Sequence, residues 1–199
     1  MRIAAGLLST ELSSATLHPT DNNAMQQIAP PGAYMLQTIE DLSIGVWVRE
    51  SPSIFAYTLV LSLHAIGLAI VLGLNALIAL RLLGVAPAIP LSALRGVYGT
   101  IWFGFAINAI SGGMLFIASA TNMGVMSVFW IKMAAVALGM TLALRLKSRF
   151  LDDPTATAAG TVPAGARRMA WWSLGVWFFA LTVGRMTGYP ELVHRWFGI

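Results

Sequence analysis

Three ionisable side chains interrupt the long apolar stretches of this 199-residue chain: His64, Lys132 and Arg185. An imidazole can ligate a metal such as haem iron, and a cationic group can hold a carboxylate, a phosphate or a quinone oxygen. A charged residue at the centre of a membrane helix costs roughly 2.5–3.5 kcal/mol, so it usually faces the interior of a bundle. These three residues are therefore the first candidates for chemistry.

His64 has polar neighbours at helical spacing. Tyr57 and Asn75 lie 7 and 11 residues away and share its helix face, and Asn108 in the next apolar stretch lies at a similar depth. Two interpretations stay open. Neutral His64 could simply hydrogen-bond Asn108 or a backbone carbonyl, or an imidazole nitrogen could ligate a metal, above all the iron of haem b.

Lys132 and Arg185 fall in the outer halves of their apolar stretches, with no carboxylate inside any stretch to neutralise them. With His64 on the iron, both cations could face the haem propionates, and Asn108 and Tyr57 complete the expected cofactor-binding set. A quinone or a lipid phosphate could use the same positive field, while snorkelling to the headgroups also explains Arg185 alone. The lack of intramembrane Asp or Glu argues against a proton relay or a cation channel.

Methionines offer a second metal hypothesis. Met114, Met123 and Met126 lie near the ends of two apolar stretches, and soft thioethers select Cu(I). Methionine is also common apolar filler, and that interpretation accounts for these residues equally simply.

The elements that must position these residues are four apolar runs, each long enough to cross about 30 Å of hydrocarbon as a helix. Apolar residues make up 57 % of the chain and charged residues only 10 %. We therefore predict an all-α, four-helix transmembrane bundle. The runs are at 54–79, 99–120, 125–144 and 170–189.

Three regions are expected along the chain. Residues 1–33 are polar and proline-rich and predict a flexible arm, 34–52 predict a short interfacial amphipathic helix, and 53–199 predict the four-helix transmembrane domain. Only 121–124 separates the second and third runs, which predicts that these two helices are antiparallel neighbours.

The basic residues of two loops predict the orientation, because cytoplasmic loops are enriched in Lys and Arg. They place both termini in the periplasm and the chain, as a multi-pass protein, in a bacterial inner membrane. The same loops account for a pI near 10 without nucleic acid. The loop residues are Arg81, Arg95, Arg145, Lys147, Arg149, Arg167 and Arg168.

Several strings carry a resemblance: Arg49–Glu50–Ser51–Pro52, His64, Arg81–Leu82–Leu83–Gly84, Gly104–Phe105, Ser111–Gly112–Gly113–Met114–Leu115–Phe116 and Phe129–Trp130–Ile131–Lys132. Over roughly 36–144 the chain resembles an uncharacterised family of small bacterial four-helix inner-membrane proteins, which implies fold and location. An early transmembrane histidine and a lysine in the third helix are distantly similar to the haem-binding membrane protoporphyrinogen oxidase. The copper-resistance D family shares a four-helix module of this kind.

The sequence thus favours a cofactor-holding protein, for haem b or quinone, or an accessory subunit of a membrane redox system with a partner subunit. Copper handling or small-solute transport is one alternative, and a structural anchor or assembly subunit is another. The chain has no cysteine, which excludes iron–sulfur clusters and covalent haem attachment. No nucleotide loop, HExxH or Gly-x-Ser-x-Gly motif indicates an enzyme acting on its own.

Overall fold

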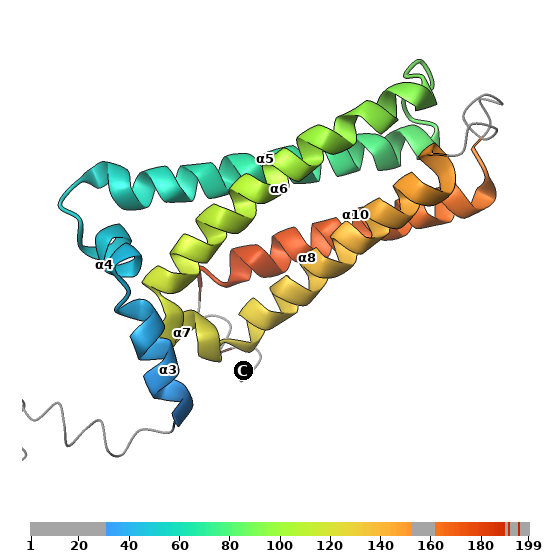
Figure 1. Cartoon of the computed structure of the whole chain (residues 1–199). Coiled ribbons are helices and arrows are strands. Elements are labelled where there is room, and N and C mark those ends of the chain that lie inside the picture. Colours follow the sequence, from blue (N-terminus) through green and yellow to red (C-terminus); the bar gives the residue numbers. More distant parts are fainter. Residues whose placement is uncertain (1–30, 153–161, 190, 192–194, 196–199) are drawn as a thin grey trace, which may run out of the picture.

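The computed structural model describes residues 31–152, 162–189, Glu191 and Arg195, so nearly all of the expected arm 1–33 lies outside it. The described part is helical, with no strand (Figure 1). Its elements are α3 (Pro31–Glu40), α4 (Ser43–Glu50), α5 (Ile54–Leu83), α6 (Leu91–Ala118), α7 (Ala120–Val125), α8 (Ser127–Leu146), the short π-helix η1 (Lys147–Leu151) and α10 (Ala164–Met186).

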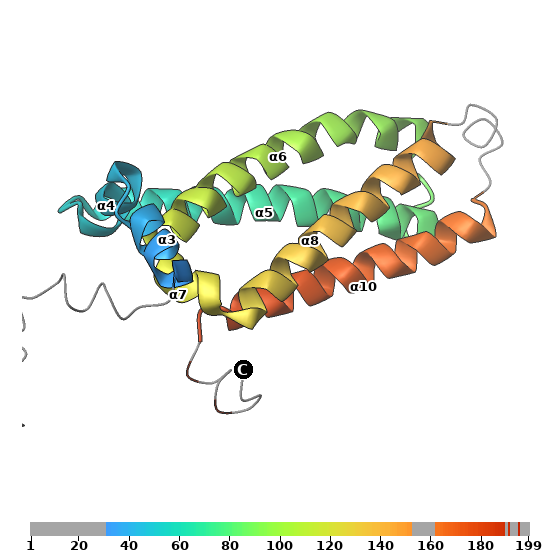
Figure 2. The same ribbon diagram turned by 60° about the horizontal axis from the view of Figure 1, so that its bottom comes forward.

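The four long helices form two antiparallel pairs. α5 lies along α6, α8 lies along α10, and α10 also packs on α5 (Figures 1 and 2). α6 and α8 follow one another in the chain, yet they share no comparable interface. The two helices run antiparallel, as expected, but they pack on each other only weakly, because the segment between them folds into α7.

Glycines set the close approach of α5 to α6. A Cβ atom on Gly67 would lie 2.6 Å from the backbone N of Asn108 and 2.7 Å from the backbone O of Gly104. A Cβ atom on Gly104 would lie 2.5 Å from the side chain of Ile70. Small residues at such a crossing let two backbones meet where lipid supplies no hydrophobic drive for association.

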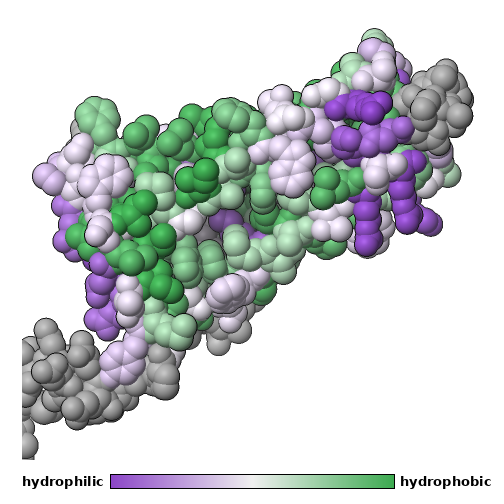
Figure 3. All heavy atoms as spheres, in the orientation of Figure 1, coloured by the Kyte–Doolittle hydropathy of each residue, from purple (hydrophilic) through white to green (hydrophobic). Residues whose placement is uncertain are grey.

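Three helices have the length and the apolar composition of membrane spans: Phe55–Leu83, Leu91–Ala118 and Ser127–Leu151. α10 is equally a helix, but three arginines and three tryptophans lower its apolar character. Hydrophilic side chains gather at the two ends of the described molecule, with an apolar midsection between them (Figure 3). This distribution is typical of a membrane protein, because the hydrocarbon core meets only the midsection.

One end of the molecule, here named the cap end, is built by α3, α4 and α7. Residues 34–52 fold into two helices, α3 and α4, rather than one, because the chain turns at Asp41–Leu42. Glu40 receives hydrogen bonds from the backbone N of Thr121 at 2.8 Å and from its hydroxyl. Arg49 bonds both Glu40 at 3.3 Å and the backbone O of Ala118 at 3.4 Å. These contacts hold α3 and α4 against α6 and α7.

The charge on Glu40 should make the cap end sensitive to acid. Burial raises the pKa of Glu40, but the Thr121 hydrogen bonds and the Arg49 charge outweigh it and hold the pKa below its ordinary value of 4.5. A lowered pKa stabilises the folded state at neutral pH, and this contribution is lost as the pH falls through 4.5 toward the folded value.

We expect Glu40→Gln to weaken the protection of α7 amides against hydrogen exchange by about 1–2 kcal/mol at pH 7, the size of a charge-assisted hydrogen bond. The difference between wild type and variant should shrink as the pH drops below 4. A difference that stays constant down to pH 3 would contradict this assignment.

The opposite end, here named the basic end, is closed by side chains that bridge elements. Asp152 bonds Lys147 of η1 at 2.7 Å and Arg95 of α6 at 3.1 Å. The hydroxyl of Tyr98 on α6 donates to the backbone O of Ala143 on α8 at 3.0 Å. Arg81, expected in a loop, is instead buried at the end of α5, where its Nε donates to the backbone O of Ile89.

Candidate functional site

The imidazole of His64 lies at the α5–α6 interface, half-buried and surrounded by hydrogen-bonding groups. Its Nδ1 is 3.0 Å from the backbone O of Asn108. The side-chain amide of Asn108 donates to the backbone O of His64 at 2.8 Å, and the hydroxyl of Ser111 donates to the backbone O of Ile107 at 2.6 Å. The structure thus brings His64 and Asn108 together, reciprocally bonded across the two helices.

This network selects one tautomer of His64. A carbonyl oxygen only accepts, so the 3.0 Å contact requires Nδ1 to carry the proton. The amide of Asn108 and the hydroxyl of Ser111 then keep their shorter bonds to backbone oxygens. In the neutral imidazole, Nε2 is left as the unprotonated nitrogen, with a lone pair for a ligand.

Glycine makes room for the ring. A Cβ atom at Gly112 of α6 would lie 2.9 Å from Cε1 and 3.1 Å from Nδ1 of His64. The imidazole therefore lies flat against the α6 backbone at this position. Gly113, the next residue, has nothing within 4 Å of the corresponding point, so only Gly112 shapes the ring's position.

Lys132 faces the same region from α8. Its side chain is half-buried and runs beside Gly184 of α10, with Cε 3.4 Å from the point that a Cβ atom there would occupy. Among the described residues no carboxylate lies within ion-pair distance of its ammonium group, and its positive charge reaches the imidazole of His64. A cation without a carboxylate partner, whose charge acts on an imidazole, favours a ligand with anionic oxygens.

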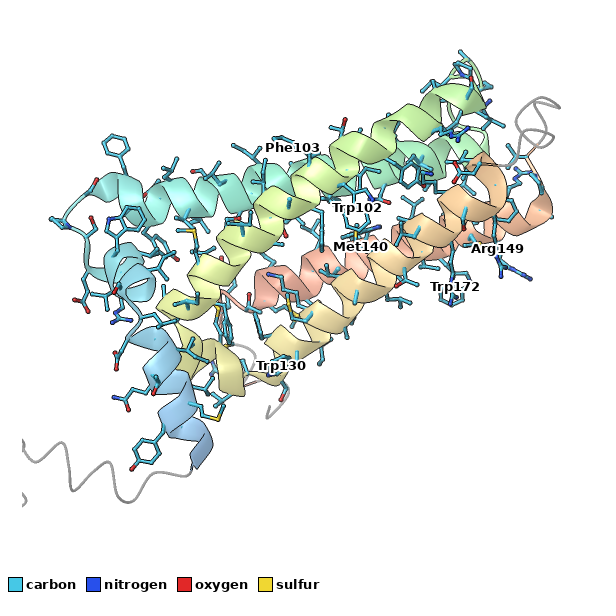
Figure 4. The ribbon with its side chains drawn as sticks, in the orientation of Figure 1. Trp102, Phe103, Trp130, Met140, Arg149 and Trp172 are labelled. Carbon is cyan, nitrogen blue, oxygen red and sulfur yellow. The ribbon has the colours of Figure 1, made fainter. Side chains whose placement is uncertain are left out.

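These groups lie beside an opening between α6 and α8. In Figure 4, Trp102 and Met140 lie between the two helices, whereas Phe103 lies on the other side of α6. Figure 3 shows hydrophilic surface recessed within the apolar midsection, at the place where Figure 1 has α6 and α8 diverging. A hollow with hydrophilic surface in it therefore opens on this side of the midsection.

The other polar residues that the sequence grouped with His64 lie away from its imidazole. Tyr57 is 52 % exposed on the outer face of α5, and Arg185 stacks over the ring of Tyr189 at 5.7 Å near the end of α10. Asn75 is buried and donates to the backbone O of Val71. Among the described residues no hydrogen bond joins Tyr57, Arg185, Asn75 or Lys132 to His64, so the pair in direct contact is His64 and Asn108, and the charge of Lys132 acts on the imidazole from α8.

The described residues bear differently on the two metal hypotheses, a haem iron at His64 and copper at the methionines. The described residues contain no group of three or more His, Asp or Glu that could hold a metal ion, so a cage of such side chains is not formed there. Met114 packs against the cluster of Val48, Val60 and Ala118 beneath α4, where it fills apolar space. A single imidazole with a free nitrogen suits a metal already held by a macrocycle better than a bare ion.

Two features were missed from the sequence. Gly112, quoted above only within a recurring string, is the surface against which the imidazole packs. Trp177 is buried over Gly139, and its Nε1–H has no hydrogen-bond partner in the described residues. A glycine within a helix and beside a serine could have indicated the role of Gly112. No local sequence pattern indicates that Trp177 is buried over Gly139.

The described residues are helical, and three of their helices have the length and apolar composition that define multi-pass membrane proteins. More particularly, the profile of the Family of unknown function (DUF6644) matches residues 39–190, and the chain belongs to that family. No curated protein and no solved structure matches the chain. The resemblance to an uncharacterised family is thereby confirmed, whereas the similarities to protoporphyrinogen oxidase and to copper-resistance D are not supported.

Proposed function

We propose that this protein holds a redox cofactor within the membrane, and that haem b ligated by Nε2 of His64 is the cofactor that the site suits best. One observation carries the proposal: the bond from Nδ1 to the backbone O of Asn108 leaves Nε2 as the lone-pair nitrogen. Metal-ligating histidines commonly use this arrangement, in which a backbone carbonyl fixes the tautomer and the ring orientation.

The residues present fit haem b in charge as well. Lys132, on the neighbouring helix α8, supplies a cation whose charge acts on the imidazole and which suits a propionate, and Gly112 lets the ring lie against α6. When bound, the haem supplies one-electron transfer, and the protein contributes axial ligation, a low-dielectric site and charge compensation. Nothing in this layout requires an enzyme acting alone, so an accessory subunit with a redox partner is the role we favour.

A quinol is the second candidate, and the pairing of His64 with Lys132 favours it. Nε2 can accept a hydrogen bond from a quinol hydroxyl, and the ammonium can donate to the opposite oxygen. Copper handling, small-solute transport and a purely structural role remain the other proposals, and each lacks a feature as specific as the oriented imidazole.

The membrane placement completes the proposal. α10 packs on α5 and α8, so we propose that it is the fourth crossing of a four-helix transmembrane bundle. The basic end would then face the cytoplasm of a bacterial inner membrane, and the cap end, with both termini, the periplasm.

The test is optical. Protein purified from a haem-sufficient host, or incubated with hemin in detergent, should show a Soret band that His64→Ala abolishes. His18→Ala and His194→Ala change the chain's other two histidines and are the controls. Lys132→Met should keep the band but weaken hemin binding by about tenfold, since it removes one charged hydrogen-bond partner. Colourless wild-type protein that refuses hemin would reject haem, and quinol binding would then be measured directly.

A further inference from the structure

α6 and α8 touch near both ends of the space between them. Toward the cap end, the rings of Phe116 and Phe129 stack at 5.1 Å. Toward the basic end, Tyr98 donates to the backbone O of Ala143. Phe129 and Ala143 are fourteen residues apart, about 21 Å along α8, so the two contacts bracket a long central interval.

Helical spacing shows which residues face this interval. On α6, Phe105, Ala109 and Gly112 continue at steps of three and four the stripe that runs from Tyr98 to Phe116. On α8, Lys132 and Val136 lie in the same way between Phe129 and Ala143. Ala109, which is small and exposed, thus lies on the stripe of α6 between its two contacts with α8, whereas Gly112 is turned toward the imidazole of His64 on α5.

Among the described residues, contacts between elements close the bundle at both of its ends. At the cap end, α7 connects α6 to α8 and is held by the bonds from Thr121 to Glu40. At the basic end, Asp152 joins Lys147 and Arg95. The remaining route into the bundle is the side between α6 and α8, where Figure 3 shows hydrophilic surface recessed among apolar side chains. In a membrane, that side faces lipid.

We infer that the ligand of the His64–Lys132 site is a membrane-borne amphiphile that enters sideways from the bilayer between α6 and α8. This rests on the proposed function. Its apolar body would pass the faces of Phe105 and Val136, and its acidic oxygens would meet Lys132, which has no carboxylate partner in the described residues. A water-borne solute would have to pass a closed end.

The experiment compares loading rates with hemin as the probe. Wild type, Ala109→Trp and Ile110→Trp are reconstituted in lipid vesicles, and hemin is delivered from donor vesicles while the Soret band is followed. Ala109 faces the interval, whereas Ile110, at the same depth, is 68 % exposed on another face of α6. Ala109→Trp should load at least tenfold more slowly than wild type, and Ile110→Trp at the wild-type rate.

If Ala109→Trp does not fold, Val136→Trp replaces it, because this substitution narrows the opening from the side of α8. Val136→Trp should slow hemin loading in the same way. Equal rates in wild type and in a folded narrowing variant would overturn the sideways route while leaving haem binding intact. A wild-type protein that never develops a Soret band would instead defeat the proposed function, so the two failures are distinguishable.

Discussion

Replacing Gly67 with alanine should lower the free energy of unfolding by about 1–3 kcal/mol, the usual cost of forcing an extra methyl group into a packed contact. The new Cβ atom would meet the backbone N of Asn108 at 2.6 Å and the backbone O of Gly104 at 2.7 Å. Neither atom belongs to a flexible side chain, so α5 and α6 must separate. That separation would also pull His64 from Asn108.

Gly73→Ala is the matched control. Gly73 lies on the same helix, and nothing lies within 4 Å of the point that its Cβ atom would occupy. Helix propensity alone then predicts a gain of up to about 1 kcal/mol, so the two variants should move in opposite directions. Thermal or denaturant unfolding in detergent measures both. If the two substitutions shift the midpoint equally, the close crossing is not what holds this pair together.

The long helices were predictable from the sequence, because an apolar segment of about 20 residues in lipid has few stable conformations other than a helix. Three of the four predicted runs meet the criteria for spans, and the fourth forms a helix with arginines at both ends. Which helices are neighbours was not predictable in the same way. A four-residue connection suggested that α6 and α8 pack closely together, but 120–125 folds into α7, and the two helices pack on each other only weakly.

The candidate site was also predictable from the sequence only in part. Polar residues in apolar stretches are visible in the sequence, so His64, Asn108 and Lys132 stood out, and the structure places them in one region. Tyr57 shares a helix face with His64 at a spacing of seven residues, yet its side chain is exposed. Helical periodicity does not predict where along α5 the helix α6 crosses it. The role of Gly112 was equally hidden, since it depends on a side chain from the other helix.

Keeping Lys132 without a carboxylate partner in the described residues opposes folding, because a cation in hydrocarbon is poorly solvated. A structural role alone would be served as well by leucine. The side chain of Lys132 runs beside Gly184 of α10, and together with an imidazole whose Nδ1 donates to the backbone O of Asn108 it would give a site with one anion-binding group and one lone-pair donor. Both groups are satisfied together by an amphiphile such as haem b or a quinol.

Gly112→Ala tests that arrangement with the smallest available change. The added methyl group would lie 2.9 Å from Cε1 and 3.1 Å from Nδ1 of His64, so the ring must move while the α6 backbone stays in place. The bond from Nδ1 to the backbone O of Asn108 should lengthen, and the preference for the Nδ1-protonated tautomer should weaken. Nitrogen chemical shifts of the ¹⁵N-labelled imidazole, measured without ligand, report this change directly.

Hemin affinity should fall at least tenfold in Gly112→Ala, which corresponds to about 1.4 kcal/mol, with little change in thermal stability. Gly113→Ala, one residue along with nothing within 4 Å, should match wild type in both measurements. Unchanged imidazole shifts in Gly112→Ala would mean that the ring is not seated against α6. Altered shifts with undiminished hemin affinity would mean that the seating of His64 does not orient it for a ligand.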